Sequence, residues 1–111
     1  MTEGVDGVRR VASATVWIPS APAKEQRRVV AWAHGTIGLG DECSPSRNPA
    51  NMPTMAPWLE QMMAAGWIVT ATDYQGLGTP PPYSYLVGEP EARDVVNSVR
   101  AARSMPGADA S

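Results

Sequence analysis

The sequence lacks most of the side chains from which common catalytic centres are built. Its 111 residues include one cysteine, Cys43, and one histidine, His34, and no glycine is followed two positions later by serine. The sequence therefore has no G-x-S-x-G turn, the motif that carries the nucleophile of many serine hydrolases. A single cysteine cannot form a disulfide within the chain, so Cys43 is either a free thiol or bonded to a partner outside these residues.

Charge and hydropathy exclude two classes of partner. The formal net charge is −2, and basic residues cluster only as the pairs Arg9-Arg10 and Arg27-Arg28, which is no electrostatic footprint for nucleic acid. No apolar run has the length of a membrane span, and residues Met1 to Gly7 lack the basic and then apolar pattern of a secretory leader. We therefore expect no nucleic-acid partner and no transmembrane segment.

Two glycine pairs invite a cofactor interpretation that their spacing does not support. Gly38-Leu39-Gly40 and Gly76-Leu77-Gly78 each follow an apolar run, but the sixth positions, Cys43 and Pro81, do not complete G-x-G-x-x-G. Asp41-Glu42-Cys43 are adjacent rather than spaced as metal ligands, and one histidine cannot supply the nitrogen ligands that zinc commonly takes. We predict no dinucleotide, no other cofactor and no metal.

The pattern of apolar residues predicts an α/β fold. Strands are expected at Ala14–Ile18, Val29–Ala33 and Ile68–Thr72, and helices near Met55–Ala65 and Glu91–Met105. The second and third strands are continuous apolar runs, which is typical of parallel strands covered on both faces. We predict that all three strands form one sheet, in which these two are parallel and adjacent.

Both ends of the chain look interrupted. Asp6-Gly7 is typical of a two-residue hairpin turn, but only five residues precede it, so the first arm of the hairpin is expected to be clipped. A helix packed on a parallel sheet should lead into another strand, yet the sequence stops at Ser111. These features predict that residues 1–111 are the N-terminal part of a single domain that is truncated at both ends.

The strand Val29–Ala33 ends abruptly at His34-Gly35 and leads into a glycine-rich loop. Ligands of open α/β sheets bind beyond the carboxyl ends of the strands, and α/β-hydrolases take one oxyanion-hole N–H from the loop after their third strand. Gly35 and Thr36 are therefore the candidate catalytic residues, as an oxyanion loop in which the Thr36 N–H points outward.

Three further features at this end of the predicted sheet have less specific interpretations. A catalytic base needs a serine within hydrogen-bond reach, so we interpret the sole histidine, His34, as a loop-shaping residue. Asp73 ends the following strand and is interpreted in the same way. Residues Tyr83 to Leu86 could line a pocket or simply pack their aromatic rings on the sheet.

Several segments together resemble the secretory lipase family, the α/β-hydrolases typified by fungal lipase A and actinobacterial triacylglycerol lipases. The similar segments are Ala33 to Ser46, which reads A-H-G-T-I-G-L-G-D-E-C-S-P-S, Gly66 to Pro80, Tyr85 to Glu89, and the entry strand Ala14 to Pro19. The resemblance covers nearly the whole chain in order.

This resemblance implies a fold, an activity and several partners. The fold would be a partial α/β-hydrolase sheet with its early strands and first two helices, without the nucleophile strand and everything after it. The activity would be that of a serine carboxylic-ester hydrolase, a triacylglycerol lipase or esterase of lipid degradation acting on acyl esters. The family's serine, acid and histidine come later in the chain, so these 111 residues alone are expected to be inactive. The resemblance also implies a secreted protein and a disulfide from Cys43 to a distant cysteine.

Two alternatives stay open. The chain could be a small non-catalytic α/β binding module, or it could belong to a hydrolase of the same fold that acts on a non-lipid ester or an amide. An in-frame G-x-S-x-G downstream would favour an enzyme, whereas a stop codon there would favour the module.

Overall fold

Three strands form a mixed sheet at the centre of the computed structural model, which describes residues 1–110 apart from the side chains of residues 53 and 54. The strands are β3 (Ala14–Trp17), β4 (Val29–Trp32) and β5 (Ile68–Thr72), in the order β3-β5-β4. The central strand β5 pairs antiparallel with β3 and parallel with β4. The predicted single sheet with two adjacent parallel strands is confirmed.

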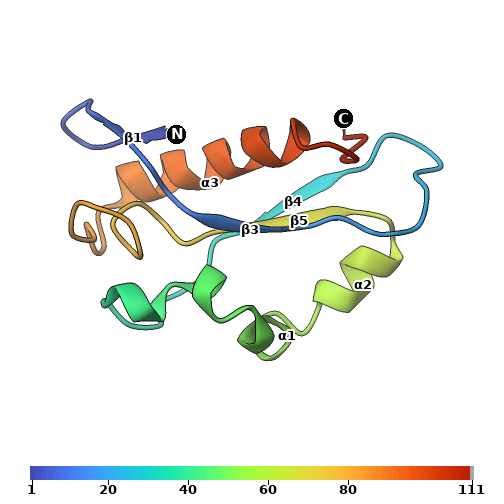
Figure 1. The fold of residues 1–111 in the computed structure, drawn as a ribbon, viewed down its shortest axis with the longest axis horizontal. Coiled ribbons are helices and arrows are strands. Elements are labelled where there is room, and N and C mark those ends of the chain that lie inside the picture. The colour runs from blue at the N-terminus through green and yellow to red at the C-terminus, as the bar shows by residue number, and fades with distance from the viewer. Residues whose placement is uncertain (111) are drawn as a thin grey trace.

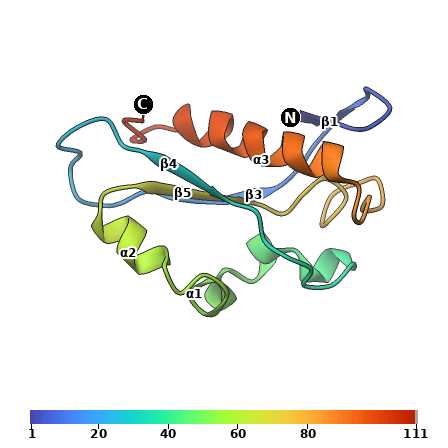
Figure 2. The same ribbon diagram turned by 180° about the vertical axis from the view of Figure 1, so that it is seen from behind.

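Helices cover both faces of this sheet (Figures 1 and 2). One face is covered by α3 (Gly88–Arg103), and the other by α1 (Met52–Met55) and α2 (Leu59–Ala64). Successive residues of a strand point to opposite faces, so Val69 packs with Ala56 and Leu59 beneath α2. Its neighbour Ile68 packs on the α3 side with Ala102 and Ala108. All five residues of β5 are buried in consequence.

The two predicted helices form with different bounds. The helix expected at Met55–Ala65 is divided into α1 and α2, and the break follows Ala56, whose backbone is non-helical at φ −131° and ψ 71°. Pro57 explains the break, because a proline disfavours helical geometry in the residue before it. Three 3₁₀ turns, at Asp41–Cys43, Pro45–Arg47 and Pro49–Asn51, precede α1. The helix expected at Glu91–Met105 is α3, which begins at Gly88.

The N-terminal residues form a small hairpin beside α3 (Figure 1). Strand β1 (Thr2–Glu3) pairs antiparallel with β2 (Arg9–Arg10), and the Arg93 side chain of α3 donates a hydrogen bond of 2.9 Å to the Gly4 carbonyl. The first arm of this hairpin is thus short, with two residues. Side chains of α3 help to hold it, a contact that sequence spacing does not reveal.

Strand β4 lies at the edge of the central sheet, and the end of the described chain returns to it. The Arg27 N–H, just before β4, donates to the Asp109 carbonyl at 2.8 Å, and Arg27 forms a parallel bridge with Ala110. The segment after α3 therefore approaches β4 on the side away from β5 and runs in the same direction. None of the helices within residues 1–110 is both long enough and apolar enough to span a membrane.

Candidate functional site

Two loops meet where the parallel strands β4 and β5 end. The first follows β4 and the second follows β5, and the Gly78 N–H of the second donates to an Asp41 carboxylate oxygen of the first at 2.9 Å. A Cβ atom at Gly78 would lie 2.9 Å from the Ser44 Oγ. The close approach of the two loops therefore depends on glycine at this position.

Asp73, at the end of β5, holds the first loop against the sheet. Its side chain is fully buried and accepts hydrogen bonds from the Ser13 hydroxyl at 2.5 Å, the Ser46 N–H at 2.9 Å and the Ser46 hydroxyl. Its own N–H donates to the Ser13 carbonyl. The carboxylate thus joins the segment before β3, the end of β5 and the loop after β4.

His34, the residue interpreted as loop-shaping, is buried between aromatic rings. Its ring lies 4.6 Å from the Tyr74 ring and meets the Trp32 ring edge-on at 6.1 Å. The Nδ1 atom lies 2.8 Å from the Gly35 carbonyl oxygen, so this contact assigns the proton to Nδ1. The Nε2 atom is buried and has no hydrogen-bond partner within residues 1–110.

Each of the two peptide groups in the proposed oxyanion loop is held by a hydrogen bond to its carbonyl oxygen. The Tyr74 hydroxyl donates to the His34 carbonyl at 3.0 Å, and the His34 Nδ1–H donates to the Gly35 carbonyl. In a planar trans peptide the N–H points opposite to the C=O, so each contact also fixes the direction of the following N–H. Across the described residues, neither the Gly35 nor the Thr36 N–H donates a hydrogen bond within the protein.

The surroundings of these two donors are open. Gly35 and Thr36 are exposed, and a Cβ atom placed on Gly35 would meet no atom within 4 Å. The Thr36 side chain forms a hydrogen bond of 2.9 Å with the Tyr85 hydroxyl, which holds the loop from the other side. The space beside the Gly35 Cα atom is therefore open.

A row of aromatic rings connects the two loops. The Tyr83 ring stacks on Tyr74 at 6.2 Å and contacts Tyr85 at 6.0 Å. Tyr83 also lines a cleft of about 460 Å³ with residues of both loops, namely Leu39, Gly40, Asp41, Gly76 and residues 79–82. Of the two alternatives for Tyr83 to Leu86, Tyr83 lines a cleft, and its ring stacks on Tyr74, which follows β5, rather than on a strand of the sheet.

The phenols of Tyr74 and Tyr83 stay protonated well above neutral pH. Burial, and after it the charges of Glu91 and Asp94, raise the pKa of Tyr74 above its ordinary value of 10.0. Burial and the hydrogen bond to Glu91 likewise raise the pKa of Tyr83. Tyr74 therefore remains a hydrogen-bond donor to the His34 carbonyl.

Tyr74 is the site residue that sequence reasoning missed. The available signal was its place directly after Asp73, where a predicted parallel strand ends. Its contact with His34 also depends on which residues of β5 pair with which residues of β4. A sequence pattern predicts that the two strands are neighbours but does not give this register.

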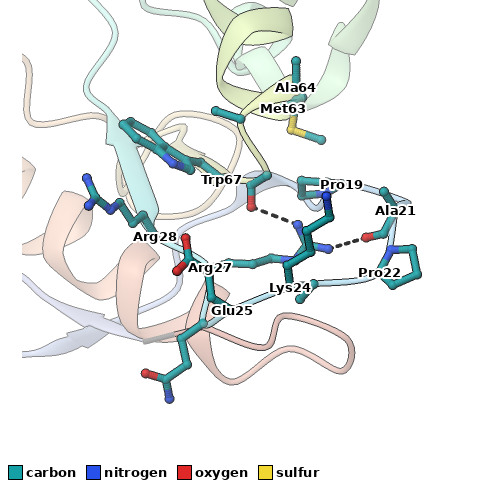
Figure 3. A pocket seen from close by; sticks show the side chains of 14 residues that line it. Pro19, Ala21, Pro22, Lys24, Glu25, Arg27, Arg28, Met63, Ala64 and Trp67 are labelled. Carbon is teal, nitrogen blue, oxygen red and sulfur yellow. Dashed lines mark hydrogen bonds between the residues drawn. The ribbon is translucent and has the colours of Figure 1, made fainter.

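A second pocket, of about 330 Å³, lies at the opposite end of the parallel strands (Figure 3). It is formed by the segment between β3 and β4 and by the turn between α2 and β5. The buried Arg27 side chain donates to the Gly66 carbonyl at 2.9 Å and to the Ala21 carbonyl. Arg27 thus fastens the two segments together, and this pocket is separated from the proposed oxyanion loop by the length of β4.

Comparison with known proteins gives no family for the chain: no protein-family model matches it, and no curated protein is significantly similar to it. Within residues 1–110, no three His, Cys, Asp or Glu side chains are grouped so that they could hold a metal ion. The candidate site comprises the Gly35-Thr36 backbone, the side chains that hold it, and the cleft lined by the loops after β4 and β5.

Proposed function

We propose that the chain is the N-terminal part of an α/β-hydrolase and supplies half of the oxyanion hole of a serine carboxylic-ester hydrolase. The observation that carries this proposal is the exposed Gly35-Thr36 backbone, whose N–H groups donate no hydrogen bond within residues 1–110. Their peptides are anchored beyond the carboxyl end of a parallel strand, where such sheets bind ligands. Donors fixed in advance are what stabilises charge developing on an oxygen.

The sheet topology supports the same proposal. Because Ala110 pairs in parallel beside Arg27, a strand continuing past residue 111 would follow the outer edge of β4 and end next to His34. In α/β-hydrolases the nucleophile lies on a sharp turn after a strand, and the residue after it gives the second oxyanion donor. A serine on such a turn would face the Gly35-Thr36 loop.

The chemistry would be acyl transfer. The serine oxygen bonds to the ester carbonyl carbon while a histidine base takes its proton, and the carbonyl oxygen becomes an oxyanion that accepts a hydrogen bond from the Thr36 N–H. Collapse of this intermediate breaks the bond to the alcohol, which leaves with the proton from the histidine. Water then releases the acid by the same steps in reverse. Residues 1–111 would provide the backbone donors of the Gly35-Thr36 loop but no triad member, so they would not turn over substrate alone.

The cleft beside the loop supports a neutral acyl ester as the substrate class. Its walls include Leu39 and the prolines at positions 80 to 82, and its one ionisable carboxylate, Asp41, repels anions. We therefore favour a triacylglycerol or a simple ester over a charged substrate. By the same resemblance, the complete protein would be secreted, and Cys43 would be disulfide-bonded to a later cysteine.

Labelling with an alkyl fluorophosphonate, which bonds covalently to activated serines, tests the proposal. The complete natural protein should be labelled on one serine beyond residue 111, whereas residues 1–111 expressed alone should take no label. A p-nitrophenyl ester and the matching p-nitroanilide then separate esterase from amidase activity. A natural chain that ends here, or one that takes no label, would contradict the proposal and favour the binding module.

A further inference from the structure

Tyr74 occupies a backbone conformation that needs support from its surroundings. Its φ of 71° lies in the left-handed region, which is unfavourable for a bulky residue and persists only where other contacts over-determine it. Here the Tyr74 N–H donates to the Thr72 hydroxyl at 3.0 Å, and the side chain is only 6% exposed. This conformation turns the chain at the end of β5 and brings the ring against the end of β4.

Both ends of the Tyr74 side chain act on one residue, His34. The hydroxyl holds the His34 carbonyl, which fixes the direction of the Gly35 N–H across the planar peptide. The ring packs on the imidazole, whose Nδ1–H in turn holds the Gly35 carbonyl and so fixes the Thr36 N–H. One tyrosine therefore controls two consecutive peptide groups, the first directly and the second through His34.

We propose that Tyr74 is a positioning residue that orients the backbone donors of the Gly35-Thr36 loop, an inference that rests on the proposed function for its catalytic meaning. The phenol does not contact substrate in this role. It acts before the reaction by holding N–H groups where an oxyanion will form, so its loss misaligns donors that are engaged chiefly in the transition state.

Tyr83 provides a matched control. It belongs to the same row of rings and stacks on Tyr74, but its hydroxyl donates to the Glu91 carboxylate of α3 at 2.8 Å rather than to the oxyanion loop. Tyr74→Phe and Tyr83→Phe each remove one hydrogen-bonded hydroxyl and keep the ring. A thermal melt of each variant measures what loss of that hydrogen bond does to the fold.

In the complete protein, Tyr74→Phe should lower kcat on a short-chain ester by about 10-fold, because small displacements of catalytic groups have effects of that order or larger. KM should stay within about twofold, since an interaction made only in the transition state affects kcat. Ser98→Ala, which removes a buried hydroxyl that donates to the Val95 carbonyl within α3 at 2.8 Å, should leave both constants near their original values. Equal losses of kcat in the two variants would overturn the inference, because they would indicate a general effect of lost hydroxyls.

A second readout does not depend on catalysis. With ¹⁵N-glycine and ¹⁵N-threonine labelling, the amide signals of Gly35 and Thr36 should move in Tyr74→Phe and stay in place in Tyr83→Phe. Unmoved signals in Tyr74→Phe would overturn the positioning role, whatever the activity. If these signals move but the unsubstituted protein hydrolyses no ester, the positioning role stands and the proposed function fails.

Discussion

At the scale of single residues, His34 and Asp73, at the strand ends, use their side chains to hold the loop after β4 in place. The His34 Nδ1–H donates to the Gly35 carbonyl, and the Asp73 oxygens accept hydrogen bonds from Ser13 and Ser46. A triad would join a histidine and a carboxylate to each other and to a nucleophile. In the proposed enzyme, the triad therefore comes from elsewhere, and these two residues shape the loop that receives the oxyanion.

The raised pKa values of two tyrosines make stability depend on alkaline pH. Above the ordinary tyrosine pKa of 10.0, the unfolded chain loses phenol protons that folded Tyr74 and Tyr83 retain. The free energy of unfolding should therefore fall as the pH rises through that value, because the folded state then binds more protons. Urea unfolding at several pH values measures the slope. The double variant Tyr74→Phe/Tyr83→Phe should show a shallower decline, and an unchanged slope would contradict the assignment.

Cys43 gives a prediction about the complete protein. If the thiol is bonded to a later cysteine, alkylation without prior reduction should leave Cys43 unlabelled and the activity intact. In residues 1–111 alone, Cys43 is free and half-buried, and mass spectrometry should find it alkylated after denaturation without reductant. Rapid labelling of Cys43 in the complete native protein, with loss of activity, would refute the structural role.

At the scale of elements, the site depends on how two loops are fastened together. Gly78 is left-handed at φ 82° and lies against Ser44, so any side chain there meets both backbone strain and a clash. The predicted strands could be found from sequence because each is a short apolar run. The contact between the loops could not be predicted from the sequence. It depends on the register of β4 with β5 and on glycine conformations that the pattern of apolar residues does not determine.

Gly78→Ala should therefore destabilise the fold by about 1–3 kcal/mol, which is the typical effect of a strained backbone residue. Gly88→Ala is the matched control, since a Cβ atom there meets nothing within 4 Å and alanine favours helix at the start of α3. Chemical denaturation of both variants provides the comparison. Equal stability of the two variants would show that the loop contact does not need glycine.

The division of the expected helix into α1 and α2 shows what apolar spacing predicts and what it misses. Apolar spacing over Met55–Ala65 predicted one helix, although Pro57 lies inside that range. Periodicity gave the correct buried face, since Leu59 and Met62 do pack in the core beneath the sheet. The proline rule, applied to Ala56, would have predicted the break as well. Tyr74 is different, because no local rule predicts which carbonyl its hydroxyl contacts.

At the scale of the whole molecule, β4 is one of the two edge strands of the central sheet. Within residues 1–110, Ala110 forms an isolated parallel bridge with Arg27, just before this strand. An unpaired edge of apolar residues invites pairing with other chains. We predict that residues 1–111 expressed alone self-associate or are poorly soluble. Sedimentation velocity tests this, and a monodisperse monomer that unfolds cooperatively would argue for an independent binding module.

The proposed function as a whole depends on the backbone donor at Thr36. Thr36→Pro in the complete protein deletes this N–H, whereas Thr36→Ser keeps both the N–H and a hydroxyl, and Thr36→Ala keeps the N–H alone. Because Tyr85 contacts the Thr36 hydroxyl, alanine could give an intermediate value. Proline also restricts the backbone, so circular dichroism and a melt must show that each variant is folded.

The most direct test of the account is kcat for ester hydrolysis by Thr36→Pro and by His34→Ala. Removing one oxyanion donor should lower kcat by about 10² or more, with Thr36→Ser close to the unsubstituted enzyme. His34→Ala should have a smaller effect than Thr36→Pro, because His34 positions the loop and is not the base. If His34→Ala instead lowers kcat by the roughly 10⁶ typical of a triad member, while Thr36→Pro has no effect, the oxyanion-loop assignment is wrong.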